Sequence, residues 1–389
     1  MTTHVFIVDS RTFKIHLEHL FAGTGGKDFE IDFNNSSTTI LHHKTEDVLG
    51  GLIADASRIR SGDFIIFYLQ QNTRYNGKFF GVFKATTDFS FLDNFEEFGR
   101  NQYLYEELDK SLTFRILIEP FEVFPEGVTE WESLDNIQHI AHPYQMLWSL
   151  IYRKLKGKRG NTMITLYESE RLVELIRNKN NNATINLMDR KLSYDENNQK
   201  IITLDNSLAT YLGRQEVINI LPRLISKYSS GLKFEPLLQA YILKNIGTGA
   251  NNTLDRSIIP ENYILEWIGN EVSCGVGMQS IDILLSAVLD DQHILIPIEL
   301  KAEKADVNNI QQIQRYVDWI QQYYIPNVEG RVRPILIAKE FANKDSEGYI
   351  GLIDSFERFN QSNVGRCESL VYIEYIVDND QVIFNPISY

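Results

Sequence analysis

The pattern of hydrophobic and polar residues along the 389-residue chain changes character twice. From His4 to about residue 164, short β-branched or aromatic runs are separated by Gly, Asn and Asp, which is typical of strands joined by turns. The runs are HVFIVDS, DFEIDF, DFIIFYL, GKFFGVFKA and FRILIEPFEVF. The pattern therefore predicts a β-rich domain over residues 1–165, which ends in an amphipathic helix, HPYQMLWSLIYRKLKGKRG.

Residues 166–230 mix helical and hairpin patterns. ESERLVELIRNK and RQEVINILPRLISKY predict two helices, and RKLSYDENNQKIITL between them predicts a hairpin with a DENN turn. We interpret this segment as a connector subdomain.

From residue 231 to the end, helices and strands alternate. FEPLLQAYILKNI predicts a helix, and NEVSCGV, SIDILLSAVL, HILIPIELKA and RPILIAKEF predict strands. VNNIQQIQRYVDWIQQYY carries apolar residues at three- and four-residue steps, so we expect a helix with one buried face. VYIEYIVDNDQVIF predicts a final strand pair. The third domain, residues 231–389, is thus expected to be an α/β sandwich within an α+β multidomain chain.

The composition narrows the class of protein. The chain is 43% hydrophobic and 23% charged, as in soluble globular proteins, and lacks the run of about 18 apolar residues that spans a membrane. Its first residues do not form a signal peptide, and Cys274 and Cys367 are too few for a disulfide framework. We therefore expect a cytoplasmic protein without membrane partners. The net charge of −14 argues against an extensive basic surface but leaves room for a local basic groove.

Three charged residues interrupt the apolar strands of the third domain. Glu299 and Lys301 are two residues apart, so they point to the same side of a strand, and a hairpin brings Asp282 beside Glu299. Two carboxylates with the carbonyl of Leu300 suit Mg²⁺ or Mn²⁺, which also binds phosphate oxygens. Such an ion activates a water molecule that Lys301 could position.

The alternative is an ordinary ion pair on a solvated sheet face. The setting favours a functional site, because Asp282 lies between Ile281 and Ile283 and Glu299 follows HILIPI. Charged groups inside such apolar runs are rarely left without a partner or a role.

The order Asp282, sixteen residues, then Glu299-Leu300-Lys301 resembles the PD-(D/E)XK nuclease superfamily, although Ile281 stands where the motif has proline. Gln312 and Tyr316 match the QxxxY motif of the next helix, where this resemblance implies contact with the DNA backbone or support of the lysine.

GVGMQSIDILL, IELK and QRYVDWI also look like the nuclease domain of NucS-type mismatch endonucleases, and the whole resemblance covers roughly residues 232–341. It implies a further acidic metal ligand, for which Glu235 is the first candidate and Glu271 the second. Either acid could equally be an exposed surface residue.

HVFIVDSRTF, RSGDFIIFYLQ and GKFFGVFKA resemble the PUA-like group that includes EVE and YTH domains. The resemblance implies a small barrel with an aromatic cage for a modified or flipped base. The candidates for nucleic-acid contact are Tyr68, Phe79, Phe80, Trp131 and Trp148. The alternative is that these rings are core residues, as aromatic residues in strands usually are.

The most basic point of the chain is RKLKGKR, with Arg153, Lys154, Lys156, Lys158 and Arg159. These residues predict contacts with DNA phosphates, or else a solvated helix end.

Taken together, the patterns predict a Mg²⁺- or Mn²⁺-dependent DNA endonuclease of the restriction type that could sense base modification. We expect it to act on double-stranded DNA as a homodimer. The alternatives are a NucS-like repair endonuclease and a non-catalytic nucleic-acid reader.

Overall fold

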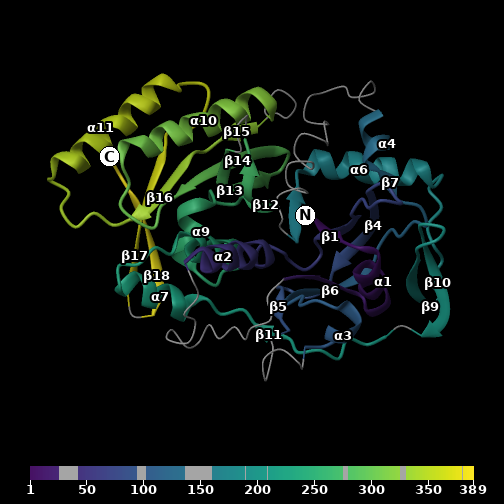
Figure 1. Cartoon of the computed structure of the whole chain (residues 1–389). Helices are drawn as coiled ribbons and strands as arrows, with labels where there is room; N and C mark the ends of the chain where they lie inside the picture. Colours follow the sequence, from purple (N-terminus) through teal and green to yellow (C-terminus); the bar gives the residue numbers. More distant parts are fainter. Residues whose placement is uncertain are drawn as a thin grey trace. The chain divides into compact units, whose positions relative to one another are not determined.

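A computed structural model describes residues 1–25, 43–93, 102–135, 160–188, 190–207, 209–274, 279–324, 330–378 and 380–389. The chain forms two compact units (Figure 1). The first contains residues 1–32 and 55–218, and the second contains residues 33–54 and 219–389. The predicted α+β arrangement, with a β-rich first part and an α/β second part, is confirmed. No helix in the described ranges is long and apolar enough to cross a membrane.

The first unit is built on one large sheet with the strand order β11-β5-β6-β4-β3-β1-β8, in which β2 pairs with β6 and β7 with β4. Its elements are β1 (Thr3–Val8), α1 (Ser10–His19), β2 (Phe21–Thr24), β3 (Phe64–Leu69), β4 (Lys78–Ala85), β5 (Phe91–Leu92), α3 (Tyr105–Leu108), β6 (Phe114–Pro120), β7 (Val128–Thr129), α4 (Glu130–Asp135), β8 (Asn161–Ile164), α6 (Leu166–Lys179), β9 (Arg190–Asp195), β10 (Lys200–Ser207) and β11 (Glu216–Val217). Strands β1 and β3 are parallel, and the other pairs are antiparallel.

The described residues of this unit form three hydrophobic clusters, of which the two larger join helices to the sheet. In one, Phe13 of α1 packs against Phe80 of β4 and Tyr194 of β9, with ring centroids 5.1 and 5.0 Å apart. In the other, Leu172 and Ile176 of α6 pack with residues of β1, β3 and β4. The β9–β10 hairpin, predicted from its DENN turn, thus contributes to the first core, so the segment interpreted as a connector is divided between the two units.

Side-chain caps fix where two of these helices begin. Asp9 accepts a hydrogen bond from the amide of Thr12, whose hydroxyl accepts one from the amide of Asp9. Thr165 and Glu168 form the same reciprocal arrangement at the start of α6. Each of these capping boxes provides hydrogen-bond acceptors for two backbone amides that have no partner within the helix. Helix α1 was not predicted, because its only start signal, the polar capping pair Asp9 and Thr12, directly follows an aromatic strand pattern.

The second unit contains a mixed sheet with the strand order β12-β13-β14-β16-β17-β18, to which β15 adds beside β14. Its elements are the greater part of α2 (His43–Ser57), α7 (Leu221–Ser229), α8 (Glu235–Asn245), α9 (Asn252–Ile258), β12 (Ile264–Ser273), β13 (Ser280–Leu289), β14 (Gln292–Leu300), α10 (Val307–Tyr323), β15 (Gly330–Val332), β16 (Ile335–Lys339), α11 (Glu347–Ser362), β17 (Val371–Asp378) and β18 (Gln381–Ile387). Strands β14, β16 and β17 are parallel, as helical crossovers through α10 and α11 require.

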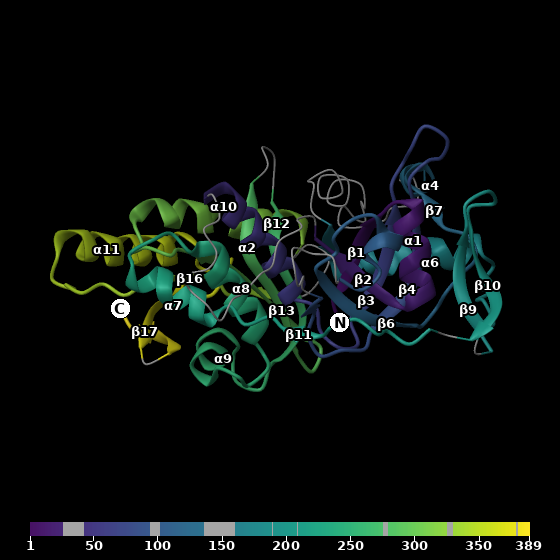
Figure 2. The same cartoon turned by 60° about the horizontal axis from the view of Figure 1, so that its bottom comes forward.

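Helices cover both faces of this sheet. Helices α10 and α11 lie side by side on one face, and α7, α8 and α9 lie on the other (Figures 1 and 2). Helix α2 approaches α8 closely at Gly50, where an added Cβ would come within 2.6 Å of the Cβ of Pro236. A larger residue at this position would therefore force the two helices apart.

One predicted helix is only half correct. RQEVINILPRLISKY predicted a helix over residues 214–228, but α7 begins at Leu221, and Glu216 and Val217 form strand β11. Pro222 lies in the first turn of α7, where its missing N–H costs no hydrogen bond. The same proline in the interior of a longer helix would remove one. The strand predicted from DFEIDF and the helix predicted over residues 142–160 fall largely outside the described residues.

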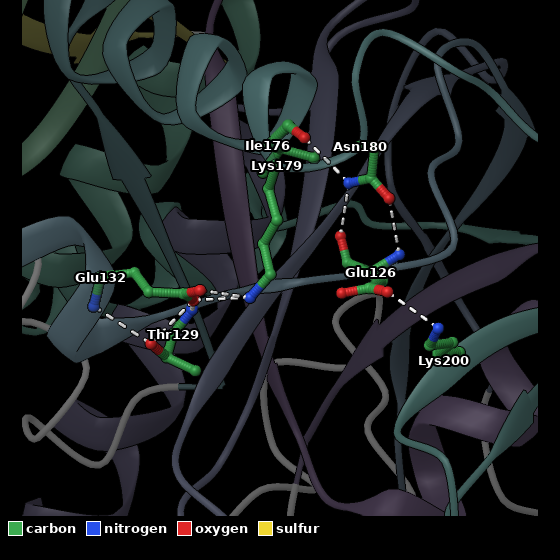
Figure 3. A network of polar contacts seen from close by, with 7 residues as sticks. All are labelled: Glu126, Thr129, Glu132, Ile176, Lys179, Asn180 and Lys200. Carbon is green, nitrogen blue, oxygen red and sulfur yellow. Dashed lines mark hydrogen bonds and ion pairs between the residues drawn. The ribbon is translucent and has the colours of Figure 1, made fainter.

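A polar network ties α6 to β7, α4 and β10 (Figure 3). The Lys179 amine donates to both carboxylate oxygens of Glu132, at 2.5 and 2.7 Å. Glu126 pairs with Lys200 at 2.8 Å, and its main chain exchanges two hydrogen bonds with the Asn180 side chain. Burial opposes the charge of Glu132, but the bonds from Lys179 and Thr129 outweigh it and lower its pKa; the Lys200 bond lowers the pKa of Glu126.

Lys179→Met is expected to make the first unit less stable at neutral pH but not in acid. Because the folded-state pKa of Glu132 is depressed, the stability that Glu132 contributes is present above the ordinary glutamate value of 4.5 and is lost as pH falls below it. We expect a loss of about 0.5 kcal/mol at pH 7, since the pair is partly exposed. Urea unfolding between pH 3 and 7 measures it. Lys179→Arg retains the charge and should retain the pH dependence; an equal Lys179→Met deficit at pH 3 and pH 7 would contradict the assignment.

Candidate active site

The three predicted charged residues meet where β13 and β14 stop pairing. The ladder between these strands runs to the pair Ile283 and Ile298. One residue further, the carboxylate of Asp282 accepts a hydrogen bond of 2.8 Å from the amide of Leu300. A side-chain oxygen thus replaces a ladder carbonyl, which fixes Asp282 against the strand that carries Glu299.

Glu299 is the buried centre of the cluster, with no exposed surface. The Lys301 amine lies 2.7 Å from one of its carboxylate oxygens. The Tyr316 hydroxyl, from α10, donates to the other at 2.5 Å. A cation and a phenol therefore compensate the cost of burying this carboxylate.

Gln312 and Tyr316, the two residues of the QxxxY motif, make different contacts. Tyr316 is buried against Glu299, so it braces a carboxylate of the site. The side-chain amide oxygen of Gln312, one turn earlier, accepts a hydrogen bond from the side-chain amide of Asn309 at 3.3 Å. The structure therefore brings Tyr316 into direct contact with Glu299, one of the three predicted charged residues. The role of Gln312 stays a prediction.

Helix α8 brings a further carboxylate, that of Glu235, near Lys301. A Glu235 carboxylate oxygen lies 3.9 Å from the Lys301 amine and accepts a hydrogen bond of 3.4 Å from the amide of Ala302. Its side chain is 44% exposed, so this carboxylate can be reached from solvent.

The second acid candidate, Glu271 of β12, is already engaged. One of its carboxylate oxygens accepts from the Ser280 hydroxyl at 2.8 Å and the other from the Gln239 amide at 3.3 Å. Its backbone φ of +48° is in the left-handed region, which residues other than glycine rarely adopt. Glu271 thus lies close to the site but faces Ser280 and Gln239.

The electrostatics of the cluster follow from burial and from crowding of like charges. Burial raises the pKa of Asp282 well above its usual value, and the charge of Glu299 raises it further. Burial also raises the pKa of Glu235, with Lys301 opposing. Burial disfavours the charge of Lys301, yet Glu299, Asp282 and Glu235 together raise its pKa above the ordinary lysine value. Lys301 is therefore a cation at neutral pH.

Carboxylates such as those of this cluster are the ligands that a hard divalent cation takes in proteins. Within the described ranges, no group of three or more His, Cys, Asp or Glu side chains is arranged to hold a metal ion by itself. Mg²⁺ commonly binds through one or two carboxylates and completes its shell with water and phosphate. Asp282 and Glu299 supply two such carboxylates, and their mutual repulsion is the kind that a cation relieves. The Leu300 carbonyl stays a predicted ligand.

Most of the predicted base-binding rings in the described part of the chain are buried. Phe80 has no exposed surface and packs in the core, so its predicted contact with nucleic acid is corrected to a packing role. Tyr68 and Phe79 are 6% and 2% exposed, and the Tyr68 hydroxyl donates to Glu130. Trp131, in contrast, is 58% exposed. Trp148 and the basic run from Arg153 to Arg159 lie outside the described residues.

Comparison with known protein families finds a match, which lies within the second unit. Residues 259–348 match the family described as the endonuclease NucS C-terminal domain, and this range includes Asp282, Glu299, Lys301, Gln312 and Tyr316. No curated protein matches the chain.

Several solved structures align with parts of the chain at low similarity. Human THYN1 in complex with 5-methylcytosine-containing DNA is 7% identical over 45% of this chain and 97% of its own, with a TM-score of 0.25. The DUF55 domain of human thymocyte nuclear protein 1 is 9% identical over 44% and 97%, with a TM-score of 0.26. SfsA of Pyrococcus furiosus in complex with Ca²⁺ is 9% identical over 32% and 54%, with a TM-score of 0.22. Scores this low do not establish a shared fold.

Tyr316→Phe is expected to destabilise the second unit. The substitution keeps the ring but removes the only O–H that donates to Glu299 in the described ranges, leaving a buried carboxylate oxygen without its donor. We expect the free energy of unfolding to fall by about 1–3 kcal/mol in urea titrations. Tyr323→Phe, an exposed position of the same helix, is the matched control and should change it by less than about 0.5 kcal/mol. Equal effects of the two substitutions would show that the hydroxyl is not needed.

Proposed function

We propose that this protein is a DNA endonuclease that hydrolyses phosphodiester bonds with Mg²⁺ or Mn²⁺. The observation that carries the proposal is the cluster around buried Glu299, in which Lys301, Tyr316 and the strand holding Asp282 converge. The match of residues 259–348 to the endonuclease NucS C-terminal domain supports the same reaction class.

Asp282 and Glu299 would hold the ion, with Glu235 available from α8 and the Leu300 carbonyl as a further predicted ligand. When bound, a divalent ion lowers the pKa of a coordinated water and neutralises charge on a phosphoryl oxygen. Lys301, protonated among three carboxylates, would orient the attacking water and stabilise the charge that develops on the phosphate. Tyr316 would keep Glu299 in one orientation by donating to it.

The charge of the site explains why a cation would be needed. Three acidic side chains, Glu235, Asp282 and Glu299, surround Lys301, and Glu271 lies near Glu235 and Asp282. A DNA phosphate approaching this group meets net repulsion unless a positive ion joins it. Activity should therefore depend strictly on a divalent metal.

The first unit would supply recognition. We propose that it contacts double-stranded DNA and reads a feature of it, such as base modification, as in a restriction-type enzyme. Its exposed Trp131 could stack on a base, since base–aromatic stacking needs an accessible ring. The basic run from Arg153 to Arg159 would contact phosphates. Cleavage of both strands would then call for two sites, and we propose a homodimer.

Two other candidates have specific support. The NucS-like range supports a repair endonuclease, which would cut plain mismatched DNA irrespective of modification. A non-catalytic nucleic-acid reader is supported by the contacts of Glu299, because Lys301 and Tyr316 already engage both of its oxygens.

Cleavage assays with variants of the charged cluster test the proposal. With Mg²⁺ and plain, methylated, hydroxymethylated or mismatched duplexes, Asp282→Asn, Glu299→Gln and Lys301→Met should each lower the cleavage rate about 100-fold or more. Each removes charge from the site while retaining side-chain size. DNA binding should persist in all three.

Glu303→Gln is the matched control, because this exposed acid follows the same strand two residues beyond Lys301. It should cut like the unaltered protein. If the unaltered protein binds DNA but cuts none of the four substrates with Mg²⁺ or Mn²⁺, the nuclease proposal fails and the reader is favoured.

A further inference from the structure

Gln239, in the middle of α8, makes contacts that could not be predicted from its residue type alone. The residue is 6% exposed. Its side-chain amide donates a hydrogen bond of 2.8 Å to the main-chain carbonyl of Asp282 and another of 3.3 Å to Glu271. Both partners are acceptors, so the NH₂ group must be the end that faces them.

The position of Gln239 on α8 connects this contact to the site. Glu235 lies four residues earlier, so the two side chains project from the same face of the helix. Glu235 reaches Lys301 and the amide of Ala302, while Gln239 reaches the strand that carries Asp282. One helix face therefore contacts β13 and the residues that directly follow β14.

Glu271 and Ser280 hold the Gln239 amide in place. The Ser280 hydroxyl donates to one oxygen of Glu271, which leaves the other oxygen for Gln239. Residue Glu271 has a left-handed backbone within a strand, a conformation that persists only where surrounding contacts determine it. These residues come from α8, β12 and β13, so they join the three elements at one point.

We propose that Gln239 is a positioning residue that sets the separation of Glu235 from Asp282, and that Glu271 acts through it as a brace instead of a metal ligand. The inference rests on the proposed nuclease function. Groups that orient metal ligands in this way change metal affinity or activity about 10- to 100-fold when they are removed.

The test is calorimetric titration of the full chain with Mn²⁺ in the absence of DNA. Gln239→Leu retains the bulk of the side chain but cannot donate. It should weaken Mn²⁺ binding about 10- to 100-fold and lower kcat for DNA cleavage to a similar degree, with KM for DNA unchanged. Ser280→Ala, a milder change that frees one oxygen of Glu271, should weaken Mn²⁺ binding less and in the same direction.

Asn245→Leu is the matched structural control. It removes a side-chain hydrogen bond of 2.8 Å to the Tyr241 carbonyl at the far end of the same helix. It should lower stability without changing Mn²⁺ affinity. If Gln239→Leu binds Mn²⁺ as tightly as Asn245→Leu does, the positioning role is overturned. If Gln239→Leu does not fold, an unchanged affinity in Ser280→Ala overturns it instead.

Failure of the wider function would give a different result. If the unaltered protein binds Mn²⁺ but does not cut DNA, the nuclease proposal fails, while the affinities of the variants still decide the role of Gln239. If the unaltered protein binds no Mn²⁺, the metal site and this inference fail together.

Discussion

The burial of the Glu299 carboxylate is the constraint on which the candidate site depends. An ionised carboxylate without partners in a protein interior costs several kcal/mol. The chain offsets that cost with one cation, Lys301, two residues further along, and one phenol, Tyr316, from the helix that follows. These partners come from a strand end and a packed helix face, so the sheet and α10 must both be in place before the charge can be buried.

That requirement explains which parts of the site could be predicted from the sequence. Strand alternation places Glu299 and Lys301 on one side, and a short hairpin returns Asp282 beside them. Tyr316 was identified from the QxxxY motif, and only the structure shows that it contacts Glu299. The inferences on Glu299, Lys301 and Asp282 use only the geometry of regular structure, so they need no knowledge of packing. The fold class followed from the same periodicities.

The other parts of the site depend on tertiary contacts, which leave no recognisable pattern in the local sequence. Gln239 and Ser280 are ordinary polar residues until α8, β12 and β13 meet, although the four-residue step from Glu235 could have suggested Gln239. Phe80 was predicted to contact nucleic acid because the PUA-like resemblance implies an aromatic cage. Aromatic strand residues serve both cores and binding sites, and only burial distinguishes the two roles. The overlong helix before residue 221 arose because an apolar period continued through a segment that instead forms β11.

Glu299 and Glu235 differ in how firmly the surrounding structure holds them. This difference bears on how the site would operate. Glu299 and Tyr316 are buried and bonded to each other, so their geometry is set by folding. Glu235 is 44% exposed, lies 3.9 Å from the Lys301 amine, beyond hydrogen-bonding distance, and accepts a long hydrogen bond of 3.4 Å from the amide of Ala302. A cation entering the cluster would thus meet a fixed carboxylate from the sheet and an adjustable one from α8. The contact between α8 and the Asp282 carbonyl limits how far that adjustment can go, because it ties the helix to the strand at the point where both face the site.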